Sequence, residues 1–287
     1  MARQRSGRTV QHAVLAARLQ TLRESAGLSQ KEAAEALGAH PATVRRIELA
    51  QTSLNAGQVH VLLTRYGAGP AEIDEFLSKL AAANLPGWWH PWRDVMDPWQ
   101  LDLMSVESAA RIIRVWDPAL VPLLLRTPAY ARAVDDVLRP ELAAADRIRR
   151  AELLAERQKR LNDQQTRVWA LMPAAALHTS VGSPSVMAEQ IDALRSAAED
   201  RPDITLQIHR LTGPPHALTG IPALSMYRVD VGEIPDHVVK EGGLPGTADV
   251  WDAQATITRY RLLLDLSCAA APHPNKAVEE LEIHRDV

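Results

Sequence analysis

Two helix-start signals lie twelve residues apart near the N-terminus, and the short segment between them leaves room for only one tight turn. Residues 29–32 (Ser-Gln-Lys-Glu) have the form of a capping box, in which the Ser29 hydroxyl accepts the N–H of Glu32 and the Glu32 carboxylate reaches back to Ser29. The helix that follows ends by Gly38, and Pro41 suits the first position of the next helix. Two short helices joined this closely predict a helix-turn-helix.

Helical periodicity continues on both sides of this motif. Four apolar residues recur at helical spacing before Gly27, which suits a C-terminal cap: Val14, Leu15, Leu19 and Leu22. Further helices are expected at 55–66 and 70–83. Residues 1–84 are therefore predicted to form a mainly α N-terminal helix-turn-helix bundle.

The charge of the chain is divided unevenly along its length. Residues 1–66 contain nine Lys/Arg and four Asp/Glu, a net +5, so the remaining residues carry −8 of the total −3. A basic head on an acidic body is typical of a polyanion-binding module joined to a sensing or partner-binding domain. A chance excess of cations on solvated helix faces is the alternative interpretation.

Composition narrows the class of protein. Apolar residues make up 46% and charged residues 23% of the chain, as in ordinary globular proteins. No apolar run reaches 18 residues, and the basic residues 1–10 precede no apolar segment, so neither a membrane span nor a secretion signal is expected. Cys268 is the single cysteine, which excludes an intrachain disulfide and a thiolate metal cluster. A cytoplasmic protein is expected.

A tryptophan-rich segment separates the two halves of the chain. Four of the seven tryptophans lie there among Gly/Pro breaks: Trp88, Trp89, Trp92 and Trp99. We interpret residues 85–100 as a hinge. An aromatic ligand cage is conceivable, although tryptophan in a linker more often anchors one domain against the next.

The pattern beyond the hinge predicts an α+β C-terminal domain with a small sheet over 101–271. Helices are expected at 101–115, 128–138, 141–161, 185–198 and 248–266. Strands are expected at 167–172, 204–211, 223–229 and 237–241. Residues 272–287 are expected to form a loose tail.

The helix that starts at Pro41 has two faces. On a helical wheel, one set of residues points toward the bundle (Val44, Ile47, Glu48) and the other points away (Ala42, Arg45, Arg46, Leu49). The outward face would meet the major groove of DNA. An arginine there can read guanine or hold a phosphate, and spacing alone leaves both roles open.

Two further regions are candidates for the DNA backbone. Gln30 and Lys31 stand at the start of the preceding helix, whose free backbone amides and positive dipole end favour a phosphate oxygen. The basic arm of Arg3, Arg5 and Arg8 is suited to the backbone or a minor groove, and equally to a solvated tail.

The first half resembles a known family at specific positions. Leu28-Ser29-Gln30, Ala34, Gly38, Thr43-Val44 and Arg46-Ile47-Glu48 stand at the spacing of the xenobiotic-response-element helix-turn-helix regulators, a group that includes phage repressors. The resemblance covers residues 13–66. It implies phosphate contact by Gln30, base contact from positions 41, 42 and 45, and a buried pair between Arg23 and Glu48.

The match has departures that affect base reading. Ala50 stands where the family usually has Gly, and Pro41 and Ala42 replace residues that are often polar. Direct readout would then fall on Arg45, with help from Thr43 or Arg46, and sequence specificity would be reduced.

The rest of the chain resembles an actinobacterial branch in which such a head precedes an effector domain of the DUF5753 type, often described as antitoxin-like. The resemblance rests on Gly87-Trp88-Trp89, Glu107-Ser108-Ala109-Ala110, Val121-Pro122, Leu124-Leu125, Thr127-Pro128-Ala129-Tyr130-Ala131, Arg157-Gln158 and Val181-Gly182. Relatives tend to have Gly, Gln and Glu where this chain has Leu123, Arg126 and Ala174. If these positions line a shared pocket, the ligand or partner differs here.

These patterns support two hypotheses. The first is a sequence-specific transcriptional regulator that binds duplex DNA as a homodimer, with a second domain that senses a protein or small-molecule effector. The alternative is an antitoxin-like protein that neutralises a small cognate protein and binds DNA for autoregulation. The sequence does not identify effector-binding residues.

An enzyme is not expected, and neither a cofactor nor a metal is expected. The chain has no nucleophile elbow, and proline interrupts the glycine-rich segment 242–246. His209 is better interpreted as a satisfied or exposed histidine than as a metal ligand. Glu107 and Arg111, four residues apart on a predicted helix, are interpreted as a surface ion pair.

Overall fold

The computed structural model of the chain describes residues 9–230 and 234–283. These form two compact units, the first containing 9–91, 101–106 and 234, and the second containing the rest. The basic arm predicted at Arg3, Arg5 and Arg8 lies outside the described residues.

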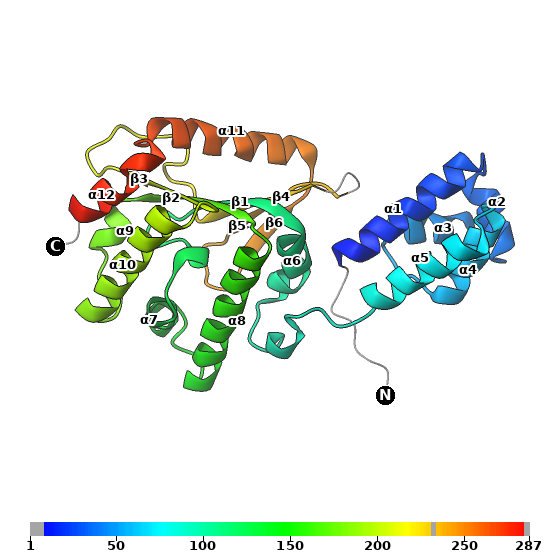
Figure 1. The fold of residues 1–287 in the computed structure, drawn as a ribbon, viewed down its shortest axis with the longest axis horizontal. Coiled ribbons are helices and arrows are strands. Elements are labelled where there is room, and N and C mark those ends of the chain that lie inside the picture. The colour runs from blue at the N-terminus through cyan, green and yellow to red at the C-terminus, as the bar shows by residue number, and fades with distance from the viewer. Residues whose placement is uncertain (1–8, 231–233, 284–287) are drawn as a thin grey trace. The chain divides into compact units, whose positions relative to one another are not determined.

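The first unit is a bundle of helices. Its helices are α1 (Val10–Ser25), α2 (Gln30–Ala36), α3 (Pro41–Glu48), α4 (Ala56–Arg65) and α5 (Pro70–Ala83) (Figure 1). Of the apolar residues predicted to recur at helical spacing or to face inward, Leu15, Leu19, Val44 and Ile47 are buried in one core, Leu22 packs against it, and Val14 is half-buried outside it. The predicted mainly α bundle is confirmed.

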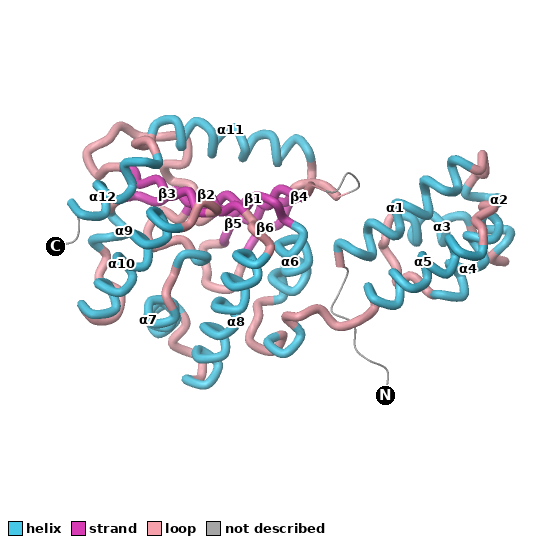
Figure 2. Tube along the Cα trace, in the orientation of Figure 1, coloured by secondary structure: helices cyan, strands magenta, loops and turns pink. Residues whose placement is uncertain are grey.

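The second unit is built on a mixed sheet of six strands. Its strands are β1 (Ala110–Trp116), β2 (Arg167–Pro173), β3 (Ile204–His209), β4 (Leu224–Val229), β5 (His237–Glu241) and β6 (Ala248–Trp251). The order across the sheet is β3-β2-β1-β4-β5-β6. Figure 2 shows the strands in magenta between layers of helices. The β1–β2 and β2–β3 pairs are parallel, and the pairs from β1–β4 to β5–β6 are antiparallel. The predicted α+β domain with a sheet is confirmed.

Helices cover both faces of this sheet. The helices of this part of the chain are α6 (Pro98–Ala109), α7 (Pro128–Leu138), α8 (Ala144–Asp163), α9 (Ala175–His178), α10 (Pro184–Asp200), α11 (Gln254–Ala270) and α12 (Ala277–Ile283), and residues 101–106 of α6 group with the first unit. Short 3₁₀ turns are η1 (His90–Trp92), η2 (Leu123–Leu125) and η3 (Pro274–Lys276). Helix α11 lies on one face, and α7, α8 and α10 lie on the other (Figure 1).

The helix predicted over 101–115 is wrong in its second half. Helix α6 ends at Ala109, and the chain continues directly as β1, a central strand in which Ile113 pairs with Val168 on one side and Tyr227 on the other. No glycine or proline separates the two elements, and a short apolar run does not distinguish a helix from a buried strand. Residues 110–116 form a strand because strands pair with them on both sides.

The helix predicted over 248–266 is also wrong at its start. Residues 248–251 form the edge strand β6, and α11 begins only at Gln254. The glycine-rich segment makes the turn of the β5–β6 hairpin, closed by the hydrogen bond from Gly242 N to Thr247 O (2.8 Å). This segment is therefore a structural turn.

The predicted loose tail from 272 contains ordered structure instead. In α12, Ala277 and Leu281 are buried, and the buried Glu280 carboxylate accepts two hydrogen bonds from Arg210. Helix α12 packs against β3 and α10, and these contacts with distant segments order it.

Much of the predicted hinge belongs to the second unit, because three arginines hold it there. Arg149 donates to Asp94, Arg150 donates to Val95 O (2.9 Å), and Arg139 makes a two-point ion pair with Asp97 (2.9 and 2.6 Å). Trp99 also donates its indole N–H to Gly246 O (3.2 Å). Residues 94–99, called the strap below, are thus held by contacts to the second unit.

No helix within 9–230 or 234–283 combines the length and apolar character needed to cross a membrane.

Candidate nucleic-acid interface

Helix α2 begins at the capping box that the sequence predicts. Ser29 Oγ accepts the N–H of Glu32 (3.2 Å), and the Glu32 carboxylate accepts the N–H (2.8 Å) and the hydroxyl (2.7 Å) of Ser29. These hydrogen bonds lower the pKa of Glu32. The start of α2 is therefore fixed by its own side chains.

The turn between α2 and α3 depends on one glycine. Gly38 has φ +59°, and Ala39 N donates to Ala34 O (3.0 Å) across it, which closes α2 in a Schellman-type cap. His40 caps the next helix by accepting the N–H of Ala42 at Nδ1 (3.2 Å), and Pro41 occupies the first helical position. The predicted helix-turn-helix is confirmed.

Helix α3 presents the predicted outward face. Val44, Ile47 and Glu48 are buried, whereas Ala42, Arg45, Arg46 and Leu49 are exposed and Thr43 is half-buried. The amphipathic spacing thus separates a core face from a solvent face.

Three cations of this region are available to a polyanion. Lys31 at the start of α2 and Arg45 and Arg46 on α3 are exposed, and none forms an ion pair within the described part of the chain. On α1, by contrast, Arg18 is paired with Glu72 (3.3 Å). The exposed face of α3 and the start of α2 therefore present three cations that form no ion pair among the described residues.

Behind this face lies the pair that the resemblance implies. Arg23 Nε donates to Glu48 Oε1 (2.6 Å) and Nη2 donates to Oε2 (3.0 Å), with side-chain exposures of 8% and 1%. Arg23 Nη1 also donates to Leu28 O (2.8 Å). The hydrogen bonds with Glu48 raise the pKa of Arg23 despite its burial. The pair ties α1 to the end of α3.

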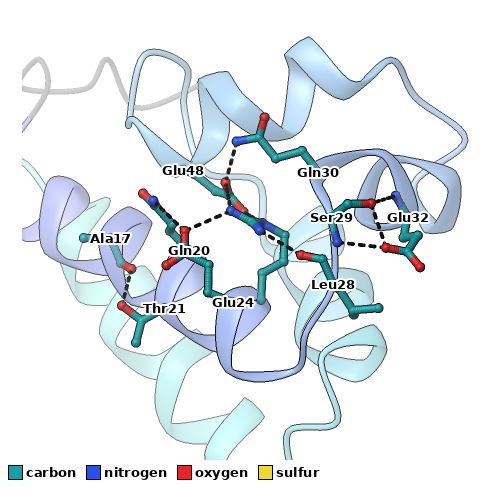
Figure 3. Close-up of polar contacts among 10 residues, drawn as sticks. Ala17, Gln20, Thr21, Glu24, Leu28, Ser29, Gln30, Glu32 and Glu48 are labelled. Carbon is teal, nitrogen blue, oxygen red and sulfur yellow. Dashed lines mark hydrogen bonds and ion pairs between the residues drawn. The ribbon is translucent and has the colours of Figure 1, made fainter.

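Gln30 takes part in the same network, as Figure 3 shows (Figure 3). Its Nε2 donates to Glu48 Oε2 (3.1 Å), and its side chain is half-buried. An amide carries two N–H donors, so one remains for a phosphate. The contact with Glu48 orients Gln30, and phosphate binding by this residue stays a prediction.

Ala50 stands where the helix-turn-helix regulators that this segment resembles usually have glycine. It has φ +48°, a conformation that glycine adopts with least strain, and it follows α3 with Gln51 N donating to Arg46 O (2.8 Å). Ala50 is buried in the core of the first unit, with 5% of the residue exposed. Helix α3 is therefore followed by a conformation that costs alanine free energy.

Glu107 corrects the sequence interpretation of the second unit. Its predicted partner Arg111 is exposed, while Glu107 is buried and receives two hydrogen bonds from Arg157 on α8, Nε to Oε1 (2.8 Å) and Nη2 to Oε2 (2.7 Å). Residue 111 lies on β1, so the helical spacing between positions 107 and 111 is interrupted.

Two of the three departures from the DUF5753-type pattern meet at one cavity. Leu123 and Arg126 both line it, whereas Ala174 is wholly buried at the start of α9 and is not part of its wall. Sequence alone identified the two positions only by comparison with relatives. Arg157, which also lines the cavity, is one of the residues that carry the resemblance, whereas Arg150 carried no signal in the sequence.

His209 is buried and satisfied. Its Nε2 donates to Ser267 O (2.9 Å), and its ring stacks on that of His216 (centroids 3.9 Å apart). Among the described residues, no group of three or more His, Cys, Asp or Glu side chains is placed to hold a metal ion.

Comparison with known families gives two matches. Residues 14–76 match a family described as a helix-turn-helix domain. Residues 100–282, more than half of the chain, match the family described as a domain of unknown function, DUF5753. Searches among curated proteins and among solved structures gave no match.

Proposed function

The chain belongs to the DUF5753 family and carries a helix-turn-helix domain of DNA-binding regulators, and from this we propose a sequence-specific transcriptional regulator whose second unit receives an effector signal. One observation carries the proposal: Lys31, Arg45 and Arg46 are exposed on a helix-turn-helix whose neighbouring charges, Arg23 and Glu48, neutralise each other inside. Phosphates and base edges are the partners that such a face fits.

The side chains on the exposed face of α3 and at the start of α2 have different hydrogen-bonding groups, so we assign them different roles. Pro41 and Ala42 offer no side-chain donor, so Arg45 is the group that reads a base, and Lys31, Gln30 and Arg46 hold the backbone. Phosphate contacts give affinity on any sequence, and base contacts give preference for one site.

The test is a binding titration after selection of the preferred duplex from a random pool. We expect Arg45→Ala to cost roughly 1–3 kcal/mol on the selected duplex and little on random DNA, and Gln30→Ala to weaken both. Arg18→Ala, which removes an exposed arginine from α1, is the matched control and should change neither. Equal losses on both duplexes for Arg45→Ala would make it a phosphate contact.

Regulation requires two heads and a receiving surface. A single helix-turn-helix contacts few base pairs, so operator affinity calls for two heads about one helical turn apart. The acidic second unit is repelled by DNA and stays available to an effector. We place the dimer contact in this unit and infer no catalytic activity for the chain.

The antitoxin-like alternative shares the same DNA-binding head. The −8 net charge outside residues 1–66 favours a basic protein partner. Affinity capture with the full-length protein, followed by titration of the purified partner against the protein–DNA complex, separates the two. Neutralisation of a toxic partner independent of DNA would support the alternative, and release from DNA by a non-toxic ligand would support the regulator.

A further inference from the structure

Three arginines line the cavity at Leu123 and Arg126. It lies within the second unit, and its charged lining consists of Arg126, Arg150, Arg157 and Asp135. Arg150 and Arg157 stand seven residues apart on α8 and therefore project from the same side of that helix. The cavity volume is about 60 Å³, several times the roughly 10–15 Å³ that one water molecule requires.

Each of the three guanidinium groups is held by fixed partners. Arg126 donates to Val121 O (2.6 Å) and Asp117 (3.1 Å), Arg150 to Asp135 (2.8 Å) and Val95 O (2.9 Å), and Arg157 twice to Glu107. A guanidinium has five N–H donors. Within the described residues, Nη1 of Arg126, Nη2 of Arg150 and Nη1 of Arg157 meet no acceptor. These side chains are therefore oriented in advance and keep donors unused.

Each arginine of the lining has one carboxylate partner: Asp117 for Arg126, Asp135 for Arg150 and Glu107 for Arg157. These charges balance, so the unused N–H donors are what the cavity offers to a ligand. An oxygen acceptor with negative charge forms stronger hydrogen bonds with guanidinium donors than water does. Arginine forks match the oxygens of carboxylate and phosphate.

We propose that this cavity binds a small oxyanion, either free or as the carboxylate or phosphate group of a larger effector. Arg126, Arg150 and Arg157 would donate to its oxygens. The regulatory meaning of this site rests on the proposed function, whereas anion binding itself does not.

The same residues hold the strap that precedes the domain. Arg150, through Nη1, binds Val95 O, and Gln100, which also lines the cavity, accepts the N–H of Asp97 (2.9 Å). Residues 94–99 lead along the chain toward α5 of the first unit. An anion bound to Arg150 would therefore favour the state in which Arg150 holds residues 94–99 over a state in which these residues are released. A ligand that binds one of two states more tightly shifts the equilibrium toward that state.

The experiment uses the full-length protein and inorganic phosphate as the probe. Calorimetric titration at constant ionic strength, with chloride as the balancing anion, measures the dissociation constant, and acetate in a parallel titration distinguishes carboxylate from phosphate. Arg150→Gln should weaken binding roughly tenfold or more, because a charged hydrogen-bonding group is lost. Arg149→Gln is the matched control: it removes an arginine contact to Asp94 while the other contacts to residues 94–99 remain, it does not line the cavity, and it should leave the constant nearly unchanged.

A second variant distinguishes a loss of binding from a loss of folding. Leu123→Phe keeps all three arginines and reduces the space, so it should weaken phosphate binding while the thermal transition stays near that of the parent. Hydrogen exchange of the amides at 94–99 should slow when phosphate is added to the parent protein and remain unchanged in Arg150→Gln.

Two results would overturn the inference: no phosphate or acetate binding by the folded parent at tens of millimolar, or equal losses in Arg149→Gln and Arg150→Gln. A DNA titration of the same samples is scored separately. DNA binding without anion binding refutes this site alone, and anion binding without DNA binding refutes the proposed function alone.

Discussion

Glu107 on α6 and Arg157 on α8 form a two-point ion pair inside the second unit, with side-chain exposures of 3% and 5%. Burial by itself would lower the pKa of Arg157, but the charge and hydrogen bonds of Glu107 more than offset burial, so the pKa is raised. Each charge is tolerated in the interior because the other is present.

Removing one member of this pair should therefore be costly. Glu107→Ala leaves the Arg157 cation buried without its partner, and we expect a loss of about 3–5 kcal/mol in the free energy of unfolding. Chemical denaturation followed by circular dichroism measures it. Glu75→Ala, which breaks the exposed Glu75–Lys79 pair, should change stability little. Similar effects for both would show that Glu107 is solvated.

The Arg23–Glu48 pair gives the corresponding prediction for the first unit. Glu48→Ala removes the acceptor for both Arg23 and Gln30, so we expect a loss of about 3–5 kcal/mol and loss of DNA binding through unfolding of the head. Glu48→Gln retains one acceptor oxygen and should lose less. A Glu48→Ala protein whose head unfolds at the parent's denaturant concentration would contradict the assignment.

Ala50 is predicted to be a site of stored strain. Ala50→Gly should recover roughly 1–2 kcal/mol of left-handed backbone strain and lose about 0.8 kcal/mol for one buried methyl group, a small net stabilisation. The measurement is the denaturation midpoint of the first unit. Ala39→Gly, at a position with negative φ, is the control and should not stabilise; a marked loss in Ala50→Gly would mean that packing outweighs strain.

The sequence predictions were right for elements that are fixed by residues close together in the sequence, and wrong for elements that are fixed by distant residues. The helix-turn-helix was predictable because its determinants are local: Ser29 and Glu32 cap one helix, Gly38 supplies a positive φ, and Pro41 starts the next helix. These signals act within a few residues and need no information from the rest of the chain.

The errors lie where distant segments decide the structure. Ile113 belongs to a strand because Val168 and Tyr227 pair with it, and neither is close in sequence. Glu107 has its partner fifty residues away on α8, while Arg111 offered a nearer but false one. The arginine-lined cavity was not predictable for the same reason, since its lining comes from α6, η2, α7 and α8.

Two stacked histidines predict a dependence of stability on pH. Burial lowers the pKa of His209 and of His216, and the charge of His216 lowers that of His209 further. The unfolded chain therefore takes up protons at a higher pH than the folded one, so stability is full above about pH 6.5 and falls as the pH decreases below it. His216 Nδ1 also accepts the N–H of Leu218 (3.2 Å), which a proton there would prevent.

Denaturant midpoints measured between pH 7.5 and 5.0 test this dependence. His216→Asn should reduce the fall toward acid, because it removes one titrating ring and the repulsion between two imidazolium groups. His60→Asn, on the exposed surface of α4, is the control and should leave the fall unchanged. An identical pH profile in the parent and in His216→Asn would show that other groups are responsible.

The dimer contact is the last prediction, and exposure assigns it to one helix of the second unit. Residues 119–125 form an apolar run but are mostly buried in the core of this unit, whereas Leu262 and Leu266, one turn apart on α11, are 56% and 53% exposed. A symmetric pairing of α11 with its copy would bury both. We expect Leu262→Lys with Leu266→Lys to give monomers by sedimentation and to weaken operator binding about 10²-fold or more, because the second head is no longer held near its half-site. Leu211→Lys, equally exposed in the loop after β3, should leave both properties unchanged. A doubly substituted protein that remains a dimer with full operator affinity would exclude α11 as the contact.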